Sequence, residues 1–257
     1  MIVTLLTDFG LTDSYVAQMK AVLLARAPGA TLVDVTHLIP PQDVRAGAFH
    51  LWAAAPAFPP GTVHLAVVDP GVGTARRALA ARTRRGDCFV GPDNGLLVPA
   101  LERLGGLDAA VALAVEGRAS HTFHGRDVFA PAAAALAAGE PLEALGSRSD
   151  LLDRSAAFPV PRRTAAGLRG SVLASDAFGN LVTNLPADAL PRSFDVHVAG
   201  RTIRGAPHAS YEAVPPGKLL AVVGSASLLE ISVRGGSARS LLRARVGTGV
   251  VVLVRRP

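Results

Sequence analysis

The sequence predicts a layered α/β domain with a mostly parallel sheet, followed by a smaller all-β, barrel-like domain. In the first 150 residues, short β-type runs alternate with stretches whose apolar positions recur at helical spacing. After residue 167 the helical periodicity fades, and short β-type runs are separated by glycine and proline. We therefore expect domains at residues 1–150 and 168–257, joined by a proline- and arginine-rich linker at residues 151–167.

The elements of the first domain follow from apolar spacing and turn residues. Strands are expected at residues 2–6, 31–35, 62–68, 78–82 and 88–90. The run at 62–68 is apolar and rich in β-branched residues, which is typical of a strand buried on both faces of a parallel sheet. Helices are expected over the apolar positions of 16–27, capped by Thr12 or Asp13, then from Asp43 through Trp52, and at 96–104 and 128–138.

The second domain carries shorter β-type runs and no comparable helical pattern. Strands are expected at residues 171–174, 181–183, 195–198, 219–223, 229–233 and 250–254. Glycine and proline between these runs indicate tight turns, so the strands are expected to be mostly antiparallel and to form a small barrel.

Composition excludes several classes of protein. The chain has 257 residues, of which 49% are hydrophobic, and its single cysteine, Cys88, excludes an internal disulfide framework and a thiolate metal cluster. Mean hydropathy is +0.35, yet no apolar run approaches the roughly 18 residues that a membrane-spanning helix needs. The first residues show no basic leader and no cleavage site, so we expect a cytoplasmic protein with no membrane partner.

The net charge of +6 is a weak indication of nucleic-acid binding. Of the 26 cationic residues two are lysines, which leaves 26 − 2 = 24 arginines. These arginines are scattered and are not gathered into a stripe with aromatic neighbours. We therefore expect no nucleic-acid partner.

Three acidic residues directly follow predicted strands, which is where open α/β sheets bind ligands. They are Asp8, Asp69 and Asp93, and Arg76 follows Asp69 by seven residues. Each acid alone is typical of an Asx turn or a helix cap. Three of them at the strand exits of one sheet favour a shared cleft.

His124, in the segment before the predicted 128–138 helix, is the candidate for acid–base chemistry. It precedes a glycine that leaves it free to face a cleft, although a lone histidine is more often structural. An Asp–His pair together with an arginine can orient and deprotonate a water. The carboxylate fixes the imidazole tautomer, and the cation stabilises the developing hydroxide.

The second domain offers another group of polar residues between two strands. Asp176, Phe178 and Asn180 give an acid, an aromatic face and an amide within five residues, which suits a zwitterionic or heterocyclic ligand. A plain hairpin turn has the same composition, and the segment around Ser225 taken alone indicates a polar turn. A phosphate-binding loop and a zinc site are not indicated, because the required lysine and a second ligand cluster are missing.

Seven segments form an ordered set along the chain: TDFGLTDSYVAQMK, VDVTHLIPPQDVRAGAF, VVDPGVGTARR, VGPDNGLL, HTFHGRDVFAP, DAFGNLVTN and SLLEISV. Together they resemble the S-adenosyl-L-methionine hydroxide adenosyltransferases, which are relatives of the fluorinase and chlorinase enzymes. The resemblance covers most of the chain and implies an N-terminal α/β domain joined to a C-terminal β-barrel-like domain. It also implies a homotrimer in which each site lies between one subunit's N-terminal domain and a neighbour's C-terminal domain.

The resemblance implies a small-molecule substrate, S-adenosyl-L-methionine, hydrolysed to adenosine and L-methionine by attack of water at ribose C5′ without a metal or other cofactor. Asp69, Arg76 and His124 would generate hydroxide, with Arg76 preferred over Arg77 because of its spacing from Asp69. Asp8 would hold the ribose diol. The second domain would contact the methionine and adenine groups through Asp176, Phe178 and Asn180, with backbone contacts from Ser225 and Glu230.

Two other functions stay open. The chain could be a halogenase that uses chloride, although halide users lack the Asp–Arg–His set, which favours water as the nucleophile. A non-catalytic module that binds nucleosides or nucleic acid would exploit the basic charge. Product analysis in chloride, and salt-dependent binding without turnover, distinguish these functions from hydrolysis.

Overall fold

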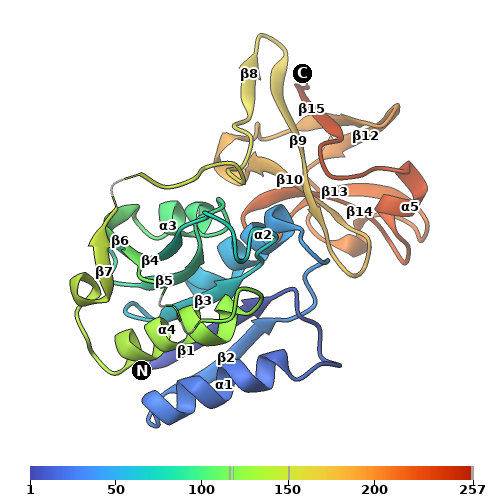
Figure 1. Ribbon diagram of the computed structural model, residues 1–257. Coiled ribbons are helices and arrows are strands. Elements are labelled where there is room, and N and C mark those ends of the chain that lie inside the picture. The colour runs from blue at the N-terminus through green and yellow to red at the C-terminus, as the bar shows by residue number, and fades with distance from the viewer. Residues whose placement is uncertain (116, 118, 150, 256–257) are drawn as a thin grey trace. The chain divides into compact units, whose positions relative to one another are not determined.

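The computed structural model describes residues 1–115, 117, 119–149 and 151–255 (Figure 1). The chain divides into two compact units, Met1–Ala157 and Phe158–Pro257, and each has its own hydrophobic core. Asp150, where the sequence suggests that the first domain ends, lies outside the described residues.

One seven-stranded sheet forms the centre of the first unit. Its strands lie in the order β2 (Thr31–Thr36), β1 (Ile2–Thr7), β3 (Val63–Val67), β5 (Cys88–Pro92), β4 (Ala78–Thr83), β6 (Leu107–Leu113) and β7 (Gly146–Arg148). The pairs among β2, β1, β3 and β5 are parallel, whereas β4, β6 and β7 join through antiparallel pairs. Strands β2, β1, β3, β5 and β6 therefore run in one direction, and the predicted α/β class is confirmed as a mixed sheet.

Helices cover both faces of this sheet (Figure 1). α1 (Tyr15–Arg26) packs against α4 (Ala130–Ala137), and α2 (Val44–Ala54) packs against α3 (Val98–Arg103). Val3 and Leu5 of β1 join the core beneath α1 and α4. Leu6 points to the opposite face, where a Cβ at Gly47 of α2 would lie 3.7 Å from its Cδ2. Because helices cover both faces of the sheet, every residue of β3 is buried.

Several element boundaries differ from those that the sequence predicts. α2 begins as expected, because the Asp43 side chain accepts a hydrogen bond from the Ala46 N–H at 2.9 Å. For α1, Ser14 occupies the N-cap position in place of Thr12 or Asp13, and no side-chain cap bond forms. A π-helical turn, Gly125–Phe129, precedes α4. The sequence did not predict β6 or β7, since the alanines of β6 are weak strand formers.

The second unit is built on a single antiparallel sheet. Its strands lie in the order β12 (Arg201–Ala206), β11 (Phe194–Val198), β15 (Gly249–Val254), β9 (Gly167–Ser175), β10 (Leu181–Pro186), β14 (Leu228–Val233) and β13 (Leu219–Val223). A short β8 (Arg162–Thr164) pairs with β9, and α5 (Ala238–Leu242) follows β14. The edge strands β12 and β13 approach each other, and the His208 N–H donates to the Ala221 carbonyl at 2.8 Å. The sheet therefore nearly closes, which confirms the predicted barrel-like architecture.

Many of the apolar residues of the chain are buried in these two cores. No helix in the described part of the chain is long and apolar enough to cross a membrane. The cytoplasmic location stays a prediction from the sequence.

A histidine lies buried at the centre of the first sheet. His64 of β3 is fully buried, with Nδ1 2.8 Å from the Thr4 Oγ1 and its ring stacked on Phe89 at a centroid distance of 4.7 Å. Burial lowers the pKa of His64 from 6.5 to about 4, and the nearby Asp87 carboxylate offsets this effect only in part. The imidazole is therefore neutral at neutral pH.

We expect the free energy of unfolding to fall as pH drops from 6.5 to about 4. In this window the unfolded His64 binds a proton and the folded one does not, so acid favours the unfolded state. The contribution of His64 amounts to about 3 kcal/mol at the acid end. It can be measured as the difference in pH dependence between the wild type and His64→Leu in urea unfolding; parallel profiles for the two proteins would contradict the assignment.

Candidate active site

The carboxyl ends of three neighbouring parallel strands meet at one edge of the first sheet, here called the exit edge. β1, β3 and β5 lie side by side in this order (Figure 1). The residues that follow them include Asp8, Asp69 and Asp93, so all three predicted acids lie along the exit edge. The three acids have different hydrogen-bond partners, so each position has a different chemical role.

Asp69, Arg76 and His124 are brought together at the exit edge and are called the triad below. The Nε of Arg76 donates to Oδ1 of Asp69 at 3.0 Å, and its Nη2 donates to Oδ2, so the pair is bidentate. The same Nη2 lies 3.1 Å from Nδ1 of His124. Arg76 therefore connects the acid to the histidine, whereas the sequence suggests a direct Asp–His pair.

The triad is buried, and burial controls its protonation. The side chains of Asp69 and Arg76 are 5% and 8% exposed, and His124 is 4% exposed. Burial raises the pKa of Asp69 against the opposing charge of Arg76. Burial and the Arg76 charge both lower the pKa of His124, so its imidazole is neutral at pH 7. Because a guanidinium only donates, Nδ1 of this imidazole accepts and its hydrogen sits on Nε2.

Close backbone approach brings the two segments of the triad together. Gly73, between Asp69 and Arg76, has a φ of +75°, and a Cβ there would lie 2.4 Å from the His121 carbonyl oxygen. A larger residue would therefore push the 69–76 turn away from the segment that carries His124. The Arg76 guanidinium also lies 5.3 Å from the centroid of the Phe129 ring, which favours its charge in this buried place.

The third acid, Asp93, has a structural role. Its Oδ2 accepts from Nη2 of Arg77, which also donates to the Leu151 carbonyl at 2.7 Å, and its Oδ1 accepts from the Asp153 N–H at 2.8 Å. These bonds hold the 151–153 segment against the end of β5, and only 3% of the Asp93 side chain is exposed. The two adjacent arginines therefore have different roles. Arg76 belongs to the triad, and Arg77 belongs to the set of bonds around Asp93 that holds the 151–153 segment, called the clamp below.

Asp8 follows β1 and is only partly buried. Its Oδ2 accepts a hydrogen bond from the Gln42 backbone N–H at 2.8 Å. Its Oδ1 makes none of the described hydrogen bonds and can accept from ligand hydroxyl groups. This geometry suits the ribose-binding role that the family resemblance implies.

The predicted ligand residues of the second unit gather around one pocket of about 880 Å³, whose lining includes Asp176, Phe178, Asn180, Tyr211, Ser225 and Glu230. Asp176 organises its turn, since Oδ1 accepts from the backbone N–H groups of Phe178 and Asn180 at 3.0 and 2.8 Å, and Oδ2 accepts from the Asn180 side chain. This turn leaves Phe178 79% exposed beside the pocket. The hairpin and ligand-site interpretations of this segment are therefore compatible.

Glu230 does more than the backbone contacts that the resemblance implies. Its buried carboxylate accepts at Oε1 from the Tyr211 hydroxyl at 2.5 Å and from the Ser232 hydroxyl at 3.0 Å. The hydrogen bond to Glu230 is the main cause that raises the pKa of Tyr211 to about 12. No pattern in the sequence points to Tyr211, because a single tyrosine in a short turn carries no periodic or motif signal.

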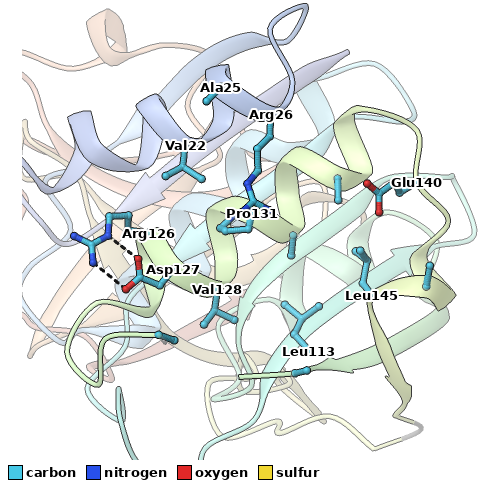
Figure 2. Close-up of a pocket in the computed structure, with 15 residues that line it drawn as sticks. Val22, Ala25, Arg26, Leu113, Arg126, Asp127, Val128, Pro131, Glu140 and Leu145 are labelled. Atoms are coloured by element: carbon cyan, nitrogen blue, oxygen red, sulfur yellow. Dashed lines mark hydrogen bonds and ion pairs between the residues drawn. The ribbon is translucent and has the colours of Figure 1, made fainter. Parts of the chain in front are cut away.

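Another pocket, of about 670 Å³, has a lining that contains none of the predicted site residues. Figure 2 shows it between α1 and α4, with the ion pair of Arg126 and Asp127 on one side and Leu113 and Leu145 on another. Its remaining lining is largely alanine and valine. Among the residues that the structure describes, no cluster of three or more His, Cys, Asp or Glu side chains could hold a metal ion. The side chains of the two pockets therefore distinguish them, because the predicted ligand residues line the pocket of the second unit.

Comparison with known proteins gives a consistent match along the chain. The SAM hydroxide adenosyltransferase N-terminal domain matches residues 3–146, and the C-terminal domain of the same family matches residues 170–251. An (R)-S-adenosyl-L-methionine hydrolase of Salinispora arenicola is 47% identical over 251 residues, covering 94% of this chain and 93% of that protein. A protein of the same name from Thermus thermophilus is 45% identical, covering 96% of this chain and 98% of its own.

Solved structures agree with this match. The crystal structure of an uncharacterized conserved protein from Thermotoga maritima has a TM-score of 0.91 and 35% sequence identity, covering 99% of this chain and 100% of that one. Both domains of the family therefore match this chain, and the two hydrolases are similar to it over nearly their whole length. The chain belongs to the SAM hydroxide adenosyltransferase family.

Proposed function

We propose that the protein hydrolyses S-adenosyl-L-methionine to adenosine and L-methionine. The observation that carries this proposal is the buried triad at the exit edge, in a chain whose near full-length relatives are named (R)-S-adenosyl-L-methionine hydrolases. The pocket of the second unit supports it, because aromatic and carboxylate groups suit an adenine ring and a cationic amino acid.

In the proposed reaction, the water oxygen forms a bond to ribose C5′ while the C5′–S bond breaks and its electron pair passes to sulfur. The sulfonium becomes the neutral thioether of methionine, and one proton is released. The leaving group needs neither a proton nor a Lewis acid, so we propose that the reaction requires no metal or other cofactor. The protein then has to bind the substrate, exclude bulk water and activate one water molecule.

The triad suits this activation. Arg76 and the Nε2–H of His124 are both donors, so they stabilise the negative charge that develops on the water oxygen in a buried site. Asp69 holds the guanidinium through both carboxylate oxygens. The released proton passes to the triad, where Asp69 and His124 are the two groups able to accept it. His124 can do so at Nδ1 only after its contact with Arg76 breaks.

We expect Arg76→Gln to lower kcat by about 100-fold or more, because the site loses its cation and the anchor of Asp69 and His124. Arg77→Gln is the matched control, since it alters the adjacent arginine of the clamp and is expected to keep kcat near that of the wild type. Both are measured by chromatography of adenosine and methionine, with and without a chelator. Wild-type kcat in Arg76→Gln would refute the role of the triad, and loss of activity with chelator would refute metal independence.

We further propose that the protein acts as a homotrimer whose active sites combine the triad of one subunit with the second-unit pocket of a neighbour. The triad and the pocket lie in different compact units, which supports a composite site. The exposed Phe178 ring beside the pocket suits coverage by a ligand or a neighbouring subunit.

Mixed oligomers test this arrangement. Arg76→Gln inactivates the first unit and Asp176→Asn impairs the second, so each variant alone is expected to be nearly inactive. Random mixing in co-expressed trimers leaves both halves intact in about a quarter of the sites, and activity should return to about that fraction of the wild type. Absence of recovery in trimers shown to contain both variants would contradict sites shared between subunits.

A further inference from the structure

A chain of side chains joins α1 to the loop that follows β1. Nζ of Lys20 in α1 lies 2.6 Å from Oδ2 of Asp34 in β2, and Oδ1 of Asp34 lies 3.0 Å from Nε2 of His37. On the other side of the ring, Nδ1 of His37 lies 2.9 Å from Oγ1 of Thr7, the last residue of β1. The same oxygen of Thr7 accepts from the Phe9 backbone N–H at 3.2 Å.

The chemistry of the donors and acceptors orients this chain. Oδ1 of Asp34 lies beside Nε2 of His37 without meeting the geometry of a hydrogen bond, so this carboxylate acts on the ring through its charge. On the other side of the ring, Nδ1 of His37 and the Thr7 hydroxyl share a hydrogen bond. Thr7 and His37 are 0% and 3% exposed, so solvent does not compete for the contact between their side chains. The position of the His37 ring therefore depends on its contacts with Asp34 and Thr7.

Asp8 lies in a short turn that is closed by the hydrogen bond from the Phe9 N–H to the Thr7 hydroxyl oxygen. Thr7 precedes it and Phe9 follows it, and the next backbone N–H, of Gly10, donates to the His37 carbonyl at 2.8 Å. The Asp8 carboxylate is itself held by a backbone N–H farther along the segment that begins at His37. Backbone hydrogen bonds with the segment that begins at His37 thus hold both the loop after β1 and the Asp8 carboxylate.

We propose that Asp34 and His37 are positioning residues that hold Asp8 in the orientation in which its carboxylate accepts hydrogen bonds from a ribose diol. They touch neither the substrate nor the triad in this role and act through Thr7 and the loop after β1. The inference rests on the proposed function and on the ribose-binding role that the family resemblance implies for Asp8.

Discrimination between nucleosides that have and lack the diol tests this role. Adenosine and 2′,3′-dideoxyadenosine share the base, so the ratio of their Kd values, measured by calorimetry on the full-length protein, isolates the contribution of the diol. Asp34→Asn nearly preserves the shape of the side chain and removes the charge that orients His37. We expect it to reduce the preference for adenosine about tenfold and to leave the Kd of the dideoxy compound little changed.

A double-mutant cycle links the effect to Asp8. In an Asp8→Asn background the diol preference is already lost, so Asp34→Asn should change it no further. Lys20→Gln is the matched control, because it alters the other partner of Asp34 and leaves the contacts of His37 and Thr7 in place. We expect this variant to keep the wild-type preference, while thermal unfolding of every variant reports any general loss of stability.

The outcomes separate this inference from the proposed function. An unchanged diol preference in Asp34→Asn, an equal weakening of both nucleosides, or additive effects in the cycle would each overturn the positioning role. Failure of the wild type to bind adenosine with a preference for the diol would overturn it as well. These measurements need no turnover, so a wild-type protein that binds adenosine in this way yet releases no methionine would refute only the proposed hydrolysis.

Discussion

The contact of the Arg76 guanidinium with both Asp69 and His124 is the interaction on which the functional account depends. A buried cation is stable only with a partner, and the bidentate Asp69 carboxylate supplies it. Burial and then this same charge lower the pKa of His124, and the guanidinium donates to the lone pair of its Nδ1. One arginine therefore sets the geometry and the tautomer of the candidate site.

The antiparallel course of β4 makes this contact possible. β3 ends at the exit edge, and β4 begins there, because Ala78 at its start pairs with Pro92 at the end of β5. Arg76 lies two residues before the start of β4 and therefore lies at the same edge as Asp69. Had β4 continued the parallel pattern, its first residues would lie at the opposite edge, away from the acid. The departure from a purely parallel sheet thus has a consequence for function.

The sequence contains enough information to predict the architecture and the triad, since strand-exit positions and motif order depend on local patterns. Asp69, Arg76 and His124 were all named in this way, and the structure brings their side chains into contact. The hydrogen-bond partners of each side chain were harder to predict, because contacts between segments that are distant in the sequence leave no local pattern. Asp93 has the same strand-exit pattern as Asp69, yet Arg77 draws it into a clamp. Tyr211 joins Glu230 only through the pairing of loops and strands in the second unit.

Attack of water at ribose C5′ is the central claim, and isotope labelling tests it most directly. The wild-type protein is incubated with S-adenosyl-L-methionine in water enriched in oxygen-18, with chloride present, and the products are examined by mass spectrometry. The account predicts adenosine with one oxygen-18 atom at its 5′-hydroxyl and unlabelled methionine. Label in the amino-acid product, or 5′-chloro-5′-deoxyadenosine as the main product, would contradict it.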